Sequence, residues 1–221
     1  MNLVILIRKE LLLELRSREI LISMITFGAS VMLLYAFAFR PTPEALREFA
    51  PGLLWTVILF VGVLALHRSH SLEKEFDAFS LLLSAPVERS TLFLSKWFGS
   101  FILLVISQVI LLPIFFLFLQ LPFPSKIVPF IGLFILVDLG ISSAGSLLSG
   151  AVMRSRVNEF LLPLLLFPMV TPLMISAVKS TAAIMESQPF SQWKLWLQLI
   201  VSFVIVFGLV GYLIYDYVSE E

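Results

Sequence analysis

The sequence contains no cysteine, and charged residues make up only 14% of its 221 positions. Without cysteine the chain can form no disulfide, no thiolate metal site and no covalent thioether attachment. Soluble domains carry about 25% charged residues. Fifteen Lys and Arg balance fifteen Asp and Glu, so no net charge attracts a polyanion. A soluble globule, a disordered tail and a nucleic-acid binder are therefore excluded.

Motifs for nucleotide binding and hydrolytic catalysis are also absent: no G-x-x-x-x-G-K-[ST], G-x-G-x-x-G, H-E-x-x-H or G-x-S-x-G occurs. The only histidines, His67 and His70, are three residues apart. This spacing suits either two ligands to a metal or haem iron or, more commonly, two solvated interfacial side chains. We predict no catalytic residue, no metal ligand and no cofactor bound directly. If nucleotide hydrolysis drives this protein, another chain must carry it out.

Long apolar runs occupy most of the chain, in which 59% of the residues are hydrophobic. A bilayer core about 30 Å thick is crossed by roughly 20 apolar residues in an α-helix. Because lipid offers no hydrogen bonds, a spanning segment must satisfy its own backbone as a helix. We therefore predict an all-α membrane protein with six transmembrane helices. The predicted spans are Ile20–Phe39, Leu53–Leu66, Trp97–Leu119, Val128–Met153, Phe160–Val178 and Leu195–Tyr215.

Lysine and arginine are distributed unequally between the two sides of the predicted bundle. Ten lie in the N-terminal segment and in the loops after spans two and four: Arg8, Lys9, Arg16, Arg18, Arg68, Lys74, Arg89, Lys96, Arg154 and Arg156. Five lie on the other side: Arg40, Arg47, Lys126, Lys179 and Lys194. Cytoplasmic loops carry the excess of these residues. We therefore predict that both termini and the loops at 67–97 and 154–159 are cytoplasmic.

The first 19 residues are too charged to span the membrane and too apolar to form a free tail. One apolar stripe at helical spacing is formed by Val4, Ile7, Leu11 and Leu15. We predict a helix over residues 1–19 in the cytoplasmic interface, separate from the transmembrane domain of residues 20–221. It is either an anchor only or an elbow helix that packs beside the bundle and moves with it. Because its apolar residues precede its charges, no cleavable signal peptide is expected.

The loop of residues 67–97 contains a second amphipathic pattern, which predicts a short cytoplasmic helix. Ser71 is placed to cap this helix, with acids in its first turn, and Pro86 ends it. Its apolar stripe and its first-turn acids are Leu72, Phe76, Phe79 and Leu83, and Glu73 and Glu75. Ser90 or Thr91 is then expected to cap the next span. A cytoplasmic apolar stripe needs a cover, either lipid headgroups or a docked soluble protein.

Asp138 lies near the middle of the fourth span, where an acid costs about 2.5–3.5 kcal/mol on insertion scales and should face protein or water. It is either a polar lining or proton site, or a structural acid hydrogen-bonded to Ser142 or to a neighbouring helix; we favour the structural role. Small residues in the same span permit close helix contacts, within the chain or with a second copy. They are Gly140, Ser142, Ser143, Ala144, Gly145, Ser146, Ser149 and Gly150.

Four prolines fall inside the predicted spans: Pro113, Pro163, Pro168 and Pro172. Each removes an intrahelical hydrogen bond and kinks or breaks the helix. We therefore predict that the fifth span, which holds three of them, is a broken helix. The breaks are either static kinks that shape the bundle or a moving hinge. Pro51 and Gly52 are taken as the start of the short second span.

Three blocks of residues resemble a known family. They are Lys9-Glu10-Leu11 with Glu14 to Glu19, Ala50-Pro51-Gly52 to Trp55 continuing to Leu72-Glu73-Lys74-Glu75, and Arg156-x-x-Glu159 followed by Leu161 to Pro168. Six spans, an N-terminal interfacial helix and a coupling helix between spans two and three resemble the membrane subunits of type-2 ABC exporters. More narrowly, the three blocks resemble the haem exporter protein B (CcmB) family of cytochrome c maturation.

The resemblance implies a non-catalytic permease subunit of a cell inner-membrane complex. The implied partners are an ABC ATPase subunit in two copies that binds ATP, a second copy of this chain, a haem-handling membrane subunit and a haem chaperone. Haem would belong to the complex, and ATP hydrolysis would drive haem delivery or release of the loaded chaperone. On this interpretation the candidate ATPase-docking residues are Leu72, Glu73, Glu75, Phe76, Phe79, Leu83 and Arg89. The candidates for a structural or gating role are Asp138, Arg156, Glu159, Pro163 and Pro168.

Some positions depart from the family. Phe76-Asp77 stands where the family has a small or polar turn, and no role is carried over to His67, His70 or Asp138. The alternatives are a type-2 ABC exporter half for a lipid, polysaccharide or drug, and a membrane scaffold without an ATPase. The blocks at 50–55 and 156–168 favour the haem system. Within the last block, an ion pair of Arg156 with Glu159 is predicted to hold the start of span five.

Overall fold

The computed structural model describes residues 3–38, 42–75, 88–152 and 158–220, and every regular element in these ranges is a helix. The helices are α1 (Leu3–Ser17), α2 (Glu19–Ala38), α3 (Pro43–Glu75), α5 (Arg89–Phe118), α6 (Ile127–Val152), α7 (Asn158–Met185) and α8 (Phe190–Glu220). Within the described ranges, six of them, α2, α3 and α5 to α8, are long and apolar enough to cross a membrane. The predicted all-α membrane protein with six transmembrane helices is confirmed.

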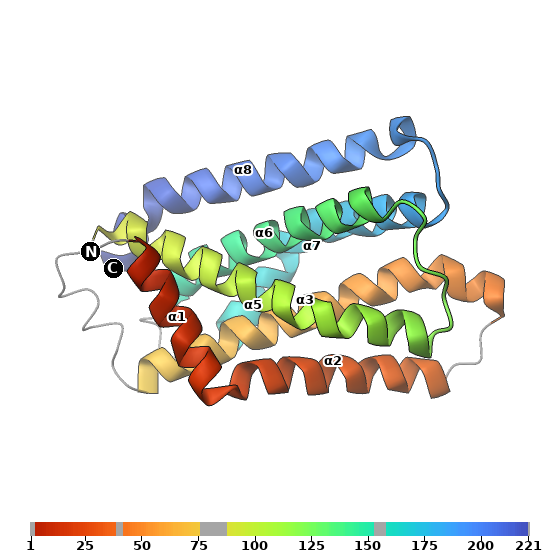
Figure 1. Ribbon diagram of the computed structural model, residues 1–221. Coiled ribbons are helices and arrows are strands. Elements are labelled where there is room, and N and C mark those ends of the chain that lie inside the picture. The colour runs from red at the N-terminus through yellow and green to blue at the C-terminus, as the bar shows by residue number, and fades with distance from the viewer. Residues whose placement is uncertain (1–2, 39–41, 76–87, 153–157, 221) are drawn as a thin grey trace.

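The six long helices run side by side, and both ends of the chain lie at one end of the bundle, which we call the terminal end (Figure 1). Helices α3 and α6 are central. In their most apolar stretches 67% and 56% of the residues are buried, against 22% in α2 and 17% in α8. The outer helices expose large apolar side chains such as Leu34 and Leu209. In a membrane these faces are covered by lipid.

Helix α3 begins at Pro43, so the prediction that the second span starts at Pro51 is wrong. The side chain of Thr42 caps the helix, since its Oγ1 accepts a hydrogen bond from the Ala45 N–H at 3.3 Å. Pro43 takes the first helical position, where a missing N–H has no consequence. Pro51 then removes one backbone hydrogen bond from a helix of 33 residues, and the helix continues through it.

Helix α7 is continuous from Asn158 to Met185 although it contains three prolines, so the prediction of a broken fifth span is wrong. Pro168 and Pro172 are one turn apart on the exposed face. The opposite face is fully buried against α3, α6 and α8, through Leu166, Val170, Leu173 and Ala177. Most helical stability comes from such packing rather than from intrinsic propensity, and here the packing outweighs the lost hydrogen bonds.

The glycines of α6 make close contacts within the chain, one of the two alternatives that the sequence left open for the small residues of this span. A Cβ atom on Gly150 would lie 2.6 Å from Cε2 of Tyr215 in α8, and one on Gly140 would lie 2.7 Å from Cδ2 of Leu173 in α7. Real Cβ contacts are longer, so a larger residue at either site would force the side chain opposite it to move, and the rigid ring of Tyr215 has less freedom to do so than the Leu173 methyl group. The backbone of α6 therefore approaches α7 and α8 closely.

Two links meet at the end of the bundle opposite the termini. Lys126, before α6, donates hydrogen bonds from Nζ to the carbonyl oxygens of Ser187 and Gln188, at 3.0 and 2.8 Å. The hydroxyls of Ser125 and Ser187 are 2.9 Å apart and share a hydrogen bond. Because one link joins α5 to α6 and the other joins α7 to α8, these bonds tie the two helix pairs together.

Candidate functional site at the terminal end of the bundle

Helix α3 ends and helix α5 begins at the terminal end of the bundle, on either side of residues 76–87 along the chain. Helix α3 runs without interruption through Ser71 to Glu75, so the prediction that Ser71 caps a separate helix is wrong. Leu72, Glu73 and Glu75 lie on the last turn of α3, because Leu, Glu and Lys are strong helix formers and no Gly or Pro follows the span before Glu75. Three other candidate docking residues, Phe76, Phe79 and Leu83, lie outside the described residues.

Helix α5 starts on the far side of this loop, and Arg89 is its first residue. Its N-cap is Glu88, whose carbonyl oxygen accepts hydrogen bonds from the N–H groups of Thr91 and Leu92. The prediction that Ser90 or Thr91 caps the span is therefore wrong. The start of α5 lies well before Trp97, so the helix carries its first turns out of the apolar span.

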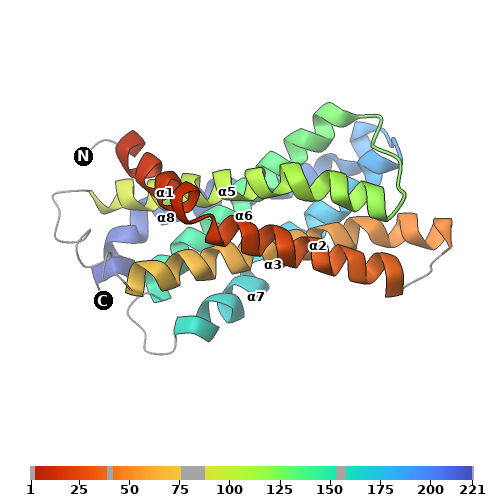
Figure 2. The same ribbon diagram turned by 60° about the horizontal axis from the view of Figure 1, so that its bottom comes forward.

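Helix α1 packs on these first turns of α5 (Figures 1 and 2). Leu6 is 2% exposed and joins Leu92, Phe93 and Tyr215 in one apolar cluster. Val4, which belongs to the predicted apolar stripe, is 73% exposed. Val4 therefore lies outside the face of α1 that packs on α5. Packing beside the bundle is what the elbow-helix alternative requires.

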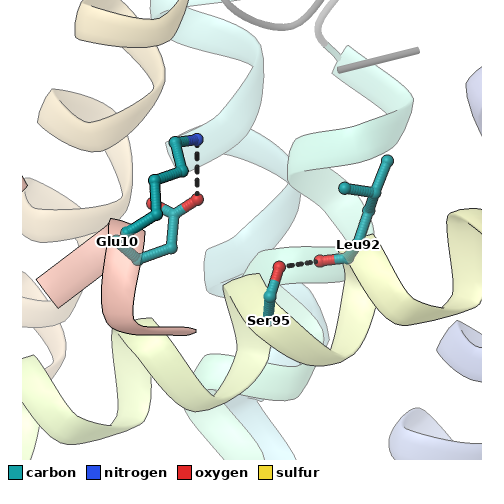
Figure 3. Close-up of polar contacts among 4 residues, drawn as sticks. Glu10, Leu92 and Ser95 are labelled. Atoms are coloured by element: carbon teal, nitrogen blue, oxygen red, sulfur yellow. Dashed lines mark hydrogen bonds and ion pairs between the residues drawn. The ribbon is translucent and has the colours of Figure 1, made fainter. Parts of the chain in front are cut away.

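Helix α1 also approaches α5 closely at Glu10 and Gly99. A Cβ on Gly99 would lie 3.2 Å from the Cβ of Glu10. Figure 3 shows Glu10 beside the segment of α5 that carries Leu92 and Ser95. The carboxylate of Glu10 pairs with Nζ of Lys9 at 3.3 Å, and the Glu10 side chain is only 15% exposed. The ion pair offsets part of the desolvation of this carboxylate at the contact.

Three aromatic side chains connect α5, α6 and α8 at the terminal end, and each lies against a glycine of another helix. The pairs are Phe93 with Gly211, Trp97 with Gly208, and Tyr215 with Gly150. We call Phe93, Trp97 and Tyr215 the aromatic clamp. The ring centroid of Phe93 is 5.6 Å from that of Trp97 and 5.5 Å from that of Tyr215. Trp97 also donates its Nε1–H to the carbonyl oxygen of Leu139 in α6 at 2.9 Å.

Asp138 is fully buried in the middle of α6. Its Oδ1 accepts a hydrogen bond from Nε2 of Gln108 in α5 at 2.6 Å, while its Oδ2 has no hydrogen-bond partner. Ser142 donates to the backbone carbonyl of Asp138 at 2.6 Å, not to the carboxyl group. The structural alternative is therefore observed through the neighbouring helix, and one carboxyl oxygen is left unused by it.

Trp55, which belongs to one of the three family-like blocks, has a structural role. Its ring is 1% exposed, its Nε1–H donates to Oγ1 of Thr181 in α7 at 2.7 Å, and its ring centroid is 4.6 Å from that of Phe134 in α6. One side chain therefore joins α3, α6 and α7. The prediction of an ion pair between Arg156 and Glu159 is untested, since Arg156 and the side chain of Glu159 lie outside the described residues.

In the part of the chain that the structure describes, no three side chains of His, Cys, Asp or Glu come together. His67 lies half-buried near the end of the second span, and the side chain of His70 is not among those described. Pro163 and Pro168, the remaining gating candidates, both lie within α7. The structure therefore does not bring the candidate residues together in one site: the described docking candidates lie at the terminal end, Asp138 in the middle of α6, and the two prolines in α7.

Sequence reasoning missed Gln108, the partner of Asp138, and the aromatic clamp. Gln108 could have been found from the sequence, because it is a strongly polar side chain within an otherwise apolar span and must find a buried partner. Nothing in the sequence pattern pointed to Phe93 or Tyr215. Aromatic residues near the ends of apolar spans are common, and a match to a particular glycine on another helix is not visible along the chain.

These features define a polytopic α-helical membrane protein whose N-terminal helix is built into the bundle. The family model described as CcmB protein matches residues 1–212. The chain belongs to the CcmB family. The protein named "Heme exporter protein B" from Paracoccus denitrificans (strain Pd 1222) is 28% identical to it over 163 residues, which are 72% of this chain and 74% of the relative.

Proposed function

We propose that this chain is the non-catalytic membrane subunit of a haem export system in the cell inner membrane, with both termini in the cytoplasm. The observation that carries the proposal is the match to the CcmB family over residues 1–212. The name of the relative from Paracoccus denitrificans supports haem as the cargo of the system. The excess of Lys and Arg at the terminal end supports the orientation.

The energy for this system comes from a separate ABC ATPase subunit, which binds ATP and acts as a pair on two copies of this chain. The absence of nucleotide-binding motifs in the sequence supports a separate ATPase. The ATPase docks at the loop between α3 and α5, and its closure displaces the two helices. A haem-handling membrane subunit and a haem chaperone complete the complex. ATP hydrolysis then drives haem delivery and release of the loaded chaperone.

Replacing Phe76 and Phe79 with aspartate is expected to abolish co-purification of the ATPase. Two unpaired carboxylates in an apolar groove cost well over about 1.4 kcal/mol, which lowers affinity by more than about tenfold. The measurement is affinity purification of the tagged chain after mild detergent extraction, with the bound chains identified by mass spectrometry. Recovery of the ATPase at the wild-type level would contradict docking at this loop.

A control is Ala78→Asp, which adds one carboxylate away from the predicted stripe and should leave ATPase recovery unchanged; for a match in charge it is compared with Phe76→Asp alone. Purification of the wild-type chain without any ATPase would favour a scaffold that works alone. Recovery of an ATPase together with a haem chaperone supports the haem system. Recovery of an ATPase with neither haem protein would favour an exporter for another substrate.

Orientation is tested by cysteine labelling, for which the cysteine-free chain needs no prior substitution. Glu88 at the terminal end and Ser125 at the opposite end are both exposed. We expect Glu88→Cys to resist an impermeant maleimide added outside intact spheroplasts and Ser125→Cys to react. The physical reason is that only the outer side of the membrane is accessible to the reagent. The reverse pattern would place the docking loop outside the cytoplasm and overturn the proposal.

A further inference from the structure

The joint between α1 and α2 is a single residue, Arg18, with a φ angle of 55°. This left-handed conformation is uncommon for a residue with a side chain, and it turns the chain sharply between the two helices. Figure 1 shows α1 at a steep angle to α2, and α1 packs on the start of α5. The covalent neighbour of α1 is therefore α2, but its packing partner is α5.

The contacts of α1 with α5 extend over two turns of both helices. Leu6 is buried with Leu92 and Phe93, and one turn later Glu10 meets Gly99 with an approach of 3.2 Å between Cβ positions. Sliding or separation of α1 from α5 would expose Leu6 and open this contact. The two helices are therefore closely packed both at Leu6 and at Glu10.

The same turns of α5 are connected to α8 by the aromatic clamp. Phe93 lies against Gly211 so closely that a Cβ there would collide with the ring, and Tyr215 belongs to the same apolar cluster as Leu6. Leu6, Phe93 and Tyr215 thus come from three helices and share one buried centre. A displacement of the start of α5 cannot leave α1 and the end of α8 behind without breaking this centre.

From this packing we infer that α1, the first turns of α5, the last turns of α8 and the part of α6 that carries Leu139 and Gly150 move as one rigid unit, with Arg18 as its joint to α2. Phe93 and Tyr215 are positioning residues in this unit. The inference rests on the proposed function, because the displacement originates at the ATPase-docking loop that precedes α5. It assigns α1 a role in passing that displacement to α8, beyond membrane anchoring.

A disulfide between α1 and α5 tests the rigid unit. In the pair Glu10→Cys and Gly99→Cys, the Cβ positions are 3.2 Å apart, close to the roughly 3.5–4.5 Å found in disulfides. No other cysteine competes. We expect the oxidised chain, assembled with its ATPase, to keep the ATP turnover and haem export of the reduced chain. Loss of export on oxidation that a reductant restores would overturn the inference.

Spin-label distances give a second measurement that does not depend on the disulfide. Arg8 on α1 and Ser30 on α2 are exposed, and Ser100, next to Gly99 in the first turns of α5, is partly exposed. When ATP is added to the complex, we expect the distance between labels at 8 and 100 to stay constant and the distance between labels at 8 and 30 to change. A change in the first distance, or no change in either, would overturn the inference. Failure of the ATPase to co-purify would instead refute the proposed function.

Discussion

Replacing Trp55 with alanine is expected to lower the free energy of unfolding by about 3–5 kcal/mol, the range for removal of a large buried aromatic side chain. The substitution removes the ring contact with Phe134 and leaves the hydroxyl of Thr181 without its donor. Because Trp55 touches both α6 and α7, the loss affects two helix interfaces at once. The measurement is equilibrium unfolding of the purified protein in mixed micelles.

Two further variants separate the contributions of the Trp55 side chain. Trp55→Phe keeps most of the apolar contact and loses only the hydrogen bond, so a loss of about 1 kcal/mol is expected. The control is Phe37→Ala, since Phe37 is 75% exposed on the outer helix α2 and should change stability little in micelles. Equal losses for Trp55→Ala and Phe37→Ala would show that Trp55 does not tie the helices together.

Replacing Gln108 with leucine is expected to destabilise the bundle by about 1–3 kcal/mol, the cost of leaving a buried polar group unsatisfied. Without Gln108, neither carboxyl oxygen of Asp138 has a hydrogen-bond partner. The penalty arises from the stranded acid and exceeds the value of an interhelical hydrogen bond itself, which averages about 0.6 kcal/mol in membranes. Unfolding in mixed micelles again provides the measurement.

The double variant Gln108→Leu with Asp138→Leu distinguishes a structural pair from a functional acid. Replacing both partners with apolar side chains can be nearly neutral for stability, so we expect the double variant to be more stable than Gln108→Leu alone. Additive losses would show that the two residues do not act as a pair. If the double variant is stable but export is lost, Asp138 has a role in transport that its contact with Gln108 does not explain.

Element boundaries were harder to predict than the elements themselves. Because proline removes a backbone hydrogen bond, the sequence predicts a helix start at Pro51 and helix breaks at the three prolines of α7. Packing of the buried face of α7, including Leu166 and Val170, maintains the helix across that local loss. The start of α3 could have been predicted from local sequence, because Thr42 followed by Pro43 is a typical pair of N-cap and first helical residue.

The candidate site could be predicted only in part. Asp138 is visible from sequence because an acid within an apolar span is costly wherever the span lies. Its partner Gln108 is on another helix, and the register of α5 against α6 is set by the fit of many side chains. Likewise, apolar spacing gave α1 a stripe that included Val4 but did not say which side of the helix packs on α5, and the fit against α5 buries Leu6.

Six helical membrane spans are predictable from the amino-acid sequence alone, because transfer of a segment into lipid depends on the sum of its own residues and on its own backbone hydrogen bonds. Which helix faces meet becomes evident only when the helices are packed. Lipid and neighbouring helices are equally apolar, so hydrophobic periodicity carries no signal that separates them inside a span. Complementary shape, as between Phe93 and Gly211 or Tyr215 and Gly150, supplies that choice, and shape exists only once the helices are packed.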